Sequence, residues 1–207
     1  MLMLSSKKDN RGFSLIELII VIAILAVFLG AGAFGMTLLT GAEAKQAANK
    51  FSSELNDVKT GNLARASEVL TLTYFAEADV DATKGIDRAG YYVIKDSYTI
   101  MNAAPDADIK VSLAGKDGSG NFLDREYSYL GNSRVEVAAV YTDGTTADPK
   151  TTPVEIEFSR KDGSLINASA TLDYVTFKSG TRVFGIDFVP STGTHNFVDG
   201  DPGTVTP

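Results

Sequence analysis

The sequence predicts an α+β fold in which one long N-terminal helix packs on an antiparallel β-sheet head. Three observations predict it. Residues 18–39 carry no charged side chain, a run longer than an ordinary strand and suited to a helix. Between residues 44 and 58, apolar side chains recur every three or four positions, as on one face of an amphipathic helix. After residue 67, short runs of strand-forming residues alternate with Gly-containing turns, a pattern typical of hairpins.

The uncharged segment is long enough to cross a membrane. As a helix rising about 1.5 Å per residue, residues 18–39 span roughly 33 Å, close to the roughly 30 Å hydrocarbon layer. Lys7, Lys8 and Arg11 precede the segment, and only Asp9 opposes them. By the positive-inside rule, this charge pattern keeps the N-terminus in the cytoplasm. We therefore expect a single-pass protein of the cytoplasmic (inner) membrane whose head lies outside the cytoplasm.

Three interpretations of this N-terminal segment compete. A secretory signal peptide would be cleaved near Ala31-Gly32-Ala33, but the apolar run continues beyond that point, and the hydrophobic region of such a signal would be long and would contain Glu17. A plain single-span anchor would tolerate Glu17 because a charge costs less near the end of a span than at its centre. The third interpretation rests on the residues that precede the apolar run.

The stretch Gly12-Phe13-Ser14-Leu15-Ile16-Glu17, after a short basic leader, resembles the class III signal of type IV pilins and pseudopilins. The resemblance implies that a prepilin peptidase, which is also an N-methyltransferase, removes leader residues 1–12 by cutting between Gly12 and Phe13. Phe13 would then become the N-methylated first residue and Glu17 the fifth. The implied partners are this enzyme, the membrane with its assembly platform, and other pilin or pseudopilin subunits in a homo- or hetero-filament.

Glu17 has a physical role in this interpretation. An α-amine at Phe13 and a carboxylate at Glu17 are each costly alone in an apolar layer. In staggered helices, the amine of one subunit can meet Glu17 of a neighbour, and at an effective dielectric near 20 opposite charges about 4 Å apart attract by roughly 4 kcal/mol before desolvation. The resemblance therefore implies a structural subunit of a pilus-like filament, at the cell surface or spanning the periplasm. A minor pseudopilin of a type II secretion or DNA-uptake machine is the first alternative, and a monomeric membrane-anchored binding module is the more distant one.

Glycines near the end of the apolar segment form a candidate soft segment of the helix. Gly30, Gly32 and Gly35 allow close approach of neighbouring helices, and each weakens the helix by about 1 kcal/mol relative to Ala. Filaments of the resembling family often contain a locally unwound helix in the corresponding region. Ordinary membrane-helix packing explains the same glycines equally well, so both explanations stay open.

The remaining chain divides into further segments. We expect residues 13–40 to form the membrane or filament-core helix, residues 41–66 its amphipathic continuation, residues 67–198 the β-rich head, and residues 199–207 a loose tail. The later half of the head weakly resembles the strand meander of H-type minor pseudopilins and related minor pilins. Strands are expected at residues 69–75, 91–95, 98–102, 109–113, 126–130, 134–141, 154–159, 174–178 and 182–189.

The composition offers little for catalysis, cofactors or metals. The 207 residues contain no cysteine and one histidine, and their formal charge of −7 argues against a nucleic-acid surface. His195 lies in a turn-rich stretch without a hydrolase motif, so we expect a surface histidine. Two acidic stretches, residues 77–87 and 116–121, could bind calcium but are expected to be solvated loops. We expect no enzyme, cofactor or metal site. The tyrosines that could form a binding patch are Tyr91, Tyr92, Tyr98, Tyr127, Tyr129 and Tyr141.

Overall fold

The computed structural model describes residues 15–64, 68–97, 125–166 and 171–204, and for residues 30–40 it describes the backbone alone. The chain divides into two compact units, Met1–Leu39 and Thr40–Pro207. One helix, α1 (Leu15–Leu63), contributes to both units. The helix was expected to run to about residue 66, but its last residue is Leu63, and the amide of Ala64 donates to the Thr60 carbonyl to close the final turn.

In the first unit, the described side chains of α1 are exposed. The large apolar side chains between Leu15 and Leu29 are 50 to 77% exposed, and they lie all around the helix rather than on one face. An exposed apolar surface of this kind marks a site of interaction with another protein or a membrane. No helix in the described part of the chain combines the length and the apolar character needed to cross a membrane.

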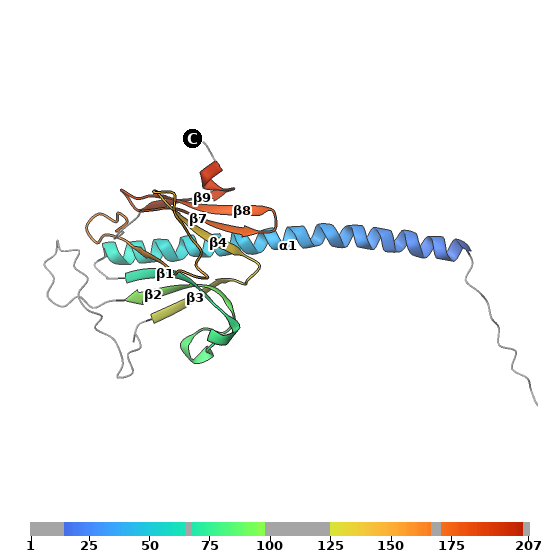
Figure 1. Cartoon of the computed structure of the whole chain (residues 1–207), viewed down its shortest axis with the longest axis horizontal. Coiled ribbons are helices and arrows are strands. Elements are labelled where there is room, and N and C mark those ends of the chain that lie inside the picture. The colour runs from blue at the N-terminus through green and yellow to red at the C-terminus, as the bar shows by residue number, and fades with distance from the viewer. Residues whose placement is uncertain (1–14, 65–67, 98–124, 167–170, 205–207) are drawn as a thin grey trace, which may run out of the picture. The chain divides into compact units, whose positions relative to one another are not determined.

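The second unit contains two antiparallel sheets (Figure 1). The four-stranded sheet has the order β3-β2-β1-β6 and the five-stranded sheet has the order β5-β4-β7-β8-β9. Three short 3-10 helices complete the described elements: η1 (Glu77–Asp79), η2 (Ala82–Lys84) and η3 (Pro202–Thr204). The strands are β1 (Glu68–Phe75), β2 (Gly90–Ser97), β3 (Arg125–Gly131), β4 (Glu136–Tyr141), β5 (Thr146–Ala147), β6 (Val154–Glu157), β7 (Leu172–Ser179), β8 (Arg182–Val189) and β9 (Thr194–Asp199).

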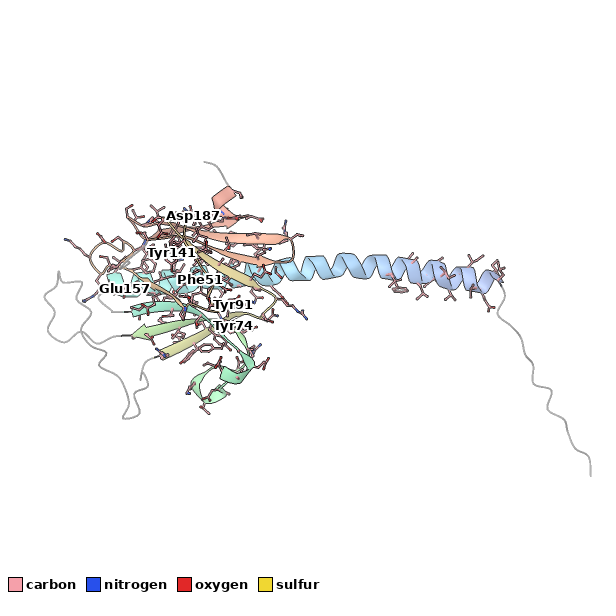
Figure 2. The ribbon with its side chains drawn as sticks, viewed as in Figure 1. Phe51, Tyr74, Tyr91, Tyr141, Glu157 and Asp187 are labelled. Atoms are coloured by element: carbon pink, nitrogen blue, oxygen red, sulfur yellow. The ribbon has the colours of Figure 1, made fainter. Side chains whose placement is uncertain are left out.

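The two sheets share one core with the second half of α1. Buried helix positions recur at intervals of three or four residues, so a single face of the helix packs on both sheets. The rings of Phe51 on α1 and Phe177 on β7 lie 5.4 Å apart. On the other sheet, the rings of Tyr74 and Tyr91 meet edge to face at 5.0 Å. Tyr91 belongs to the same buried cluster as Phe51, and Tyr74 packs against it; Figure 2 labels all three. The buried helix residues are Ala44, Ala47, Ala48, Phe51, Leu55, Val58 and Asn62.

Asn62 closes the end of the helix onto the sheets. Its side chain is 1% exposed, and its amide nitrogen donates to the carbonyls of Glu68 at 2.9 Å and Phe158 at 3.1 Å. Its oxygen accepts from the Glu68 amide at 2.7 Å. Three hydrogen bonds thus satisfy a buried polar group that would otherwise be costly. They join the last turn of α1 to the start of β1 and to the residue after β6.

The predicted α+β class, with an N-terminal helix and antiparallel sheets, is confirmed. β8 has the predicted bounds, whereas the strand predicted at 154–159 ends at Glu157 because the Ser159 carbonyl accepts from Gly163 in a tight turn. β9 was not predicted, since its residues read as a turn-rich stretch. The segments predicted as strands at 98–102 and 109–113 lie outside the described residues. Residues 199–207 were predicted to be a loose tail. Within this range, Asp199 is the last residue of β9 and residues 202–204 form η3.

Candidate functional site

Glu17 lies in the first turn of α1 and its side chain is exposed. A carboxylate in this position is favoured because unpaired amide groups give the N-terminal end of a helix a partial positive charge. The predicted cleavage residues, Gly12 and Phe13, lie outside the described residues. The backbone of α1 is continuously helical through Gly30, Gly32 and Gly35, so their unwinding in a filament stays a prediction.

The tyrosines that could form one binding patch do not lie together: some share one face of a sheet, and others point into the core or belong to the other sheet. Tyr92 of β2 pairs directly with Tyr129 of β3, and Ile94 pairs with Tyr127, which places these three tyrosines on the same face of the four-stranded sheet. Tyr91 points the other way and is buried in the core at 1% exposure. Tyr141 belongs to β4 of the five-stranded sheet, and Tyr98 lies outside the described residues. We use the term outer face for the side of the four-stranded sheet that carries Tyr92, Tyr127 and Tyr129.

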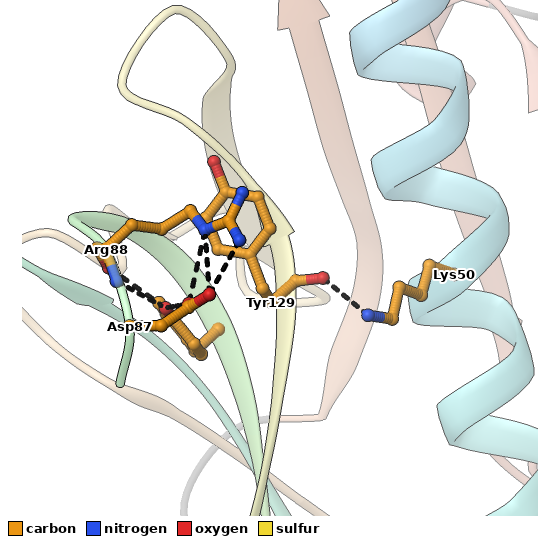
Figure 3. A network of polar contacts seen from close by, with 5 residues as sticks. Lys50, Asp87, Arg88 and Tyr129 are labelled. Carbon is orange, nitrogen blue, oxygen red and sulfur yellow. Dashed lines mark hydrogen bonds and ion pairs between the residues drawn. The ribbon is translucent and has the colours of Figure 1, made fainter. Parts of the chain in front are cut away.

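A polar network covers one end of the outer face (Figure 3). The Arg88 guanidinium lies 4.9 Å from the centre of the Tyr129 ring and forms an ion pair with Asp87 at 2.6 Å. The Tyr92 hydroxyl lies 2.9 Å from both Asp87 Oδ1 and the Arg88 carbonyl oxygen. Hydrogen bonds from Arg88 and then Tyr92 lower the pKa of Asp87 to about 2. Lys50 of α1 donates to the Tyr129 carbonyl at 2.7 Å, which links the helix to this strand.

His195 does not lie in a turn, and it is half-buried rather than fully exposed. His195 lies on β9, and its Nε2 is 3.1 Å from both the carbonyl oxygen and the hydroxyl oxygen of Ser52 on α1. Its ring packs 6.1 Å from that of Phe188, and burial lowers its pKa. Because a carbonyl can only accept, Nε2 carries the proton in this arrangement and is not available as a base toward the Ser52 hydroxyl. In the described part of the chain, the buried Nδ1 has no hydrogen-bond partner.

Three carboxylates of the acidic stretch 77–87 already have partners nearby in the chain: Asp87 as described above, and Asp79 and Asp81. Asp79 accepts from the Ala76 amide at 3.0 Å. Asp81 accepts from the Thr83 amide and hydroxyl and forms an ion pair with Lys84 at 3.2 Å. Within the ranges that the structure describes, no group of three or more acidic or histidine side chains could hold a metal ion. The second acidic stretch, residues 116–121, lies outside those ranges.

The comparison with protein families identifies the N-terminal segment. The family described as the prokaryotic N-terminal methylation motif matches residues 7–33. No curated protein and no solved structure matches the chain significantly. The matched residues contain Gly12, Phe13 and Glu17, so the resemblance seen in the sequence is confirmed. The motif implies a membrane-anchored precursor that is processed by a prepilin peptidase and assembles with other pilin subunits, which is a structural role. Residues 7–33 of this chain are the class III signal of type IV pilins and pseudopilins.

Proposed function

We propose that the chain is a structural subunit of a type IV pilus-like filament, made as a membrane-anchored precursor. Cleavage after Gly12 and N-methylation of Phe13 would produce the mature subunit. The observation that carries this proposal is the match of residues 7–33 to the N-terminal methylation motif. The position of Glu17 in the first turn of α1 supports it, since a residue there lies close to the new N-terminus.

The exposed apolar side chains of α1 support assembly through this segment. Ile16, Val27, Phe28 and Leu29 are each at least 65% exposed in the single chain. Removing apolar surface from water contributes about 25 cal/mol per Å². A surface of this kind is therefore stabilised when a membrane or neighbouring helices cover it. In our proposal, residues 13–40 hold the precursor in the cytoplasmic membrane with its N-terminus inside and later enter the filament core, while the head lies outside the cytoplasm.

Glu17 would set the register between neighbouring subunits. Apolar packing alone is non-directional and does not distinguish one stagger of helices from another. A contact between the Glu17 carboxylate of one subunit and the methylated amine of Phe13 of another would make one stagger favourable. Once both groups are in an apolar core, removal of either partner leaves the other charge buried and unpaired. The free-energy cost of that unpaired charge is larger than the net stabilisation that the intact ion pair provides. We therefore expect assembly, rather than insertion or folding, to depend on Glu17.

Isosteric replacement of Glu17 tests this function. In cells with a working prepilin peptidase, Glu17→Gln should lower the amount of subunit in sheared filaments at least tenfold, while the amount in the membrane fraction stays at the wild-type level. Glu54→Gln is the matched control, because it removes a carboxylate from the other half of the same helix. Immunoblots of both fractions measure the effect. Wild-type incorporation of the Glu17→Gln subunit would contradict the proposed contact.

Mass spectrometry of the N-terminal peptide tests the processing step independently. The expected mature chain begins with methylated Phe13. A chain that begins after residue 33 would indicate ordinary secretion. An uncleaved chain in the same cells would indicate a plain membrane anchor, and the function would then reside in the head as a monomeric binding module. A minor pseudopilin would share the methylated Phe13 and the need for Glu17, but it would be found with a secretion or DNA-uptake machine and in far fewer copies than a major subunit.

A further inference from the structure

A pocket of about 640 Å³ opens on the outer face of the four-stranded sheet, between β1, β3 and the turns that contain η1 and η2. Its volume lies within the range of small-molecule sites, roughly 300–1,000 Å³. The pocket belongs entirely to the unit Thr40–Pro207 and does not involve the apolar N-terminal segment. Its lining includes Thr71, Thr73, Phe75, Arg125 and Tyr127.

Thr73 places an unused hydroxyl in this pocket. The side chain is on the outer face because the preceding residue, Leu72, points into the core. Thr73 is only 7% exposed, and no hydrogen bond of its side chain is found in the described part of the structure. Thr71, two residues earlier on the same face, lines the pocket as well. Each hydroxyl can donate one hydrogen bond and accept two. The floor of the pocket therefore offers paired donors and acceptors to a ligand.

Aromatic rings form a wall beside these hydroxyls. Phe75 of β1 and Tyr127 of β3 both line the pocket, and their ring centres lie 6.1 Å apart at 57° to each other. Aromatic rings supply large, rigid apolar surfaces that suit the flat C–H faces of a ligand. An apolar wall next to hydroxyl groups suits a small ligand that carries an apolar face and polar groups within a few ångströms of each other.

Three of the four charged side chains that line the pocket belong to ion pairs. The fourth, Asp79, accepts a hydrogen bond from the Ala76 amide. Arg125 forms two hydrogen bonds with Asp96, at 2.6 and 2.7 Å. Lys84 pairs with Asp81 at 3.2 Å. Paired charges of this kind present polar atoms without the uncompensated charge that would attract an ion. The carboxylate of Asp79 disfavours a phosphate or a carboxylate ligand, and no group of metal-binding side chains is found among the described residues, so the lining favours a neutral polar ligand.

We propose that this pocket binds a neutral saccharide ring, with Thr71 and Thr73 contacting its hydroxyl groups and Phe75 and Tyr127 contacting its C–H face. Sugar rings combine closely spaced hydroxyl groups with an apolar face, which is the combination that the pocket offers. The site would give the subunit a binding activity in addition to its structural role. The proposal rests on the head alone and is independent of the filament function.

Saturation-transfer NMR on the full-length chain tests the proposal. The protein is prepared in a detergent without a sugar head group, and glucose, galactose, mannose and N-acetylglucosamine are offered separately. Thr73→Val keeps the side-chain volume and removes only the hydroxyl, so we expect its affinity for the bound sugar to fall about three- to tenfold, as for the loss of one or two neutral hydrogen bonds. Thr176→Val is the matched control, because Thr176 is a half-buried threonine on β7 of the other sheet. It should bind like the wild type.

Each outcome decides the proposal. Transfer to at least one neutral sugar that weakens in Thr73→Val but not in Thr176→Val supports it, provided that circular dichroism shows both variants folded. Absence of transfer from all four sugars would overturn it. Equal binding by wild type and Thr73→Val would place the sugar elsewhere and overturn the site. N-acetylneuraminic acid and inorganic phosphate are offered in parallel, and binding of these anions alone would overturn the assignment of a neutral ligand.

Discussion

His195 joins the edge strand β9 to the helix through Ser52, and its surroundings disfavour a charged ring. Burial lowers the pKa of His195 below its ordinary value of 6.5, and the nearby positive charge of Lys59 lowers it further, while the hydrogen bond to the Ser52 backbone opposes these effects. The unfolded chain therefore binds more protons than the folded chain between the two pKa values. The free energy of unfolding accordingly rises with pH through this window, reaches its full value above about pH 6.5 and declines as the pH falls.

At the residue scale, replacement of His195 should remove this part of the pH dependence. We expect protonation of His195 to lower the melting temperature at pH 5 relative to pH 7.5, and this contribution to be absent in His195→Gln, which keeps polar atoms but does not titrate. Asn196→Gln is the control, because Asn196 is an exposed neighbour on the same strand. The pKa values of Asp87 and Asp162 are lowered to about 2, so the stability that these two carboxylates contribute is lost only at a lower pH than the contribution of His195. Circular dichroism melts measure the effect, and equal pH dependence in wild type and His195→Gln would contradict it.

At the scale of elements, the β8–β9 hairpin packs on the turn that follows β6. Gly193 in this hairpin has a φ of +59°, which favours glycine. It also lies so close to the turn that an added Cβ would overlap the Gly163 carbonyl. Lys59 of α1 donates to the Thr192 carbonyl at 3.0 Å and so binds the same hairpin to the helix. The hairpin, the turn and the helix therefore depend on one close backbone contact.

A pair of glycine substitutions separates backbone strain from this contact. Gly144 has a φ of +82° and no atom within 4 Å of an added Cβ, so Gly144→Ala should lower the free energy of unfolding only by the cost of a left-handed residue, about 1–2 kcal/mol. Gly193→Ala should cost a further 1–3 kcal/mol or so, because the hairpin must also move away from the turn. Urea unfolding followed by circular dichroism measures both. Equal losses in the two variants would show that the contact does not contribute.

At the scale of the whole molecule, the apolar segment and the head have different physical requirements. The core of the head consists of residues from both sheets and of α1 from Ala44 onward, whereas the large apolar side chains of residues 15–29 are exposed in the single chain. The head therefore obtains its stability from within Thr40–Pro207. The first unit has no core of its own among the described residues, and its apolar surface needs a membrane or other subunits.

A chain that begins at Thr40 should consequently fold by itself. We expect it to be soluble without detergent and to unfold in one cooperative transition. Phe51→Ala in the same shortened chain is the control for the core, because Phe51 is fully buried; it should lower the free energy of unfolding by about 3–5 kcal/mol. Urea titration followed by circular dichroism measures both values. A shortened chain without a cooperative transition would contradict the independence of the head.

Local patterns predicted a substantial part of this structure. The alternation of Val154, Ile156 and Phe158 with polar neighbours predicted buried and exposed faces, and all three apolar side chains are buried. The apolar spacing after residue 44 predicted the helix face that packs in the core. β9 was missed because its exposed and half-buried residues include no regular apolar alternation. A strand with little buried surface shows only a weak hydrophobic pattern in its sequence. β9 is held in the sheet by its pairing with β8.

The sequence by itself determined the class III signal, the helix and most of the strands, because these depend on residues close together in the chain. Only the tertiary structure decided that β1 pairs with β6, bringing Leu70 opposite Ile156, and that one helix face packs on two sheets. It also decided that His195 meets Ser52 and that Thr73 faces a pocket beside Tyr127. These contacts join residues far apart in the chain, and their geometry follows from the packing of the whole head rather than from any local pattern.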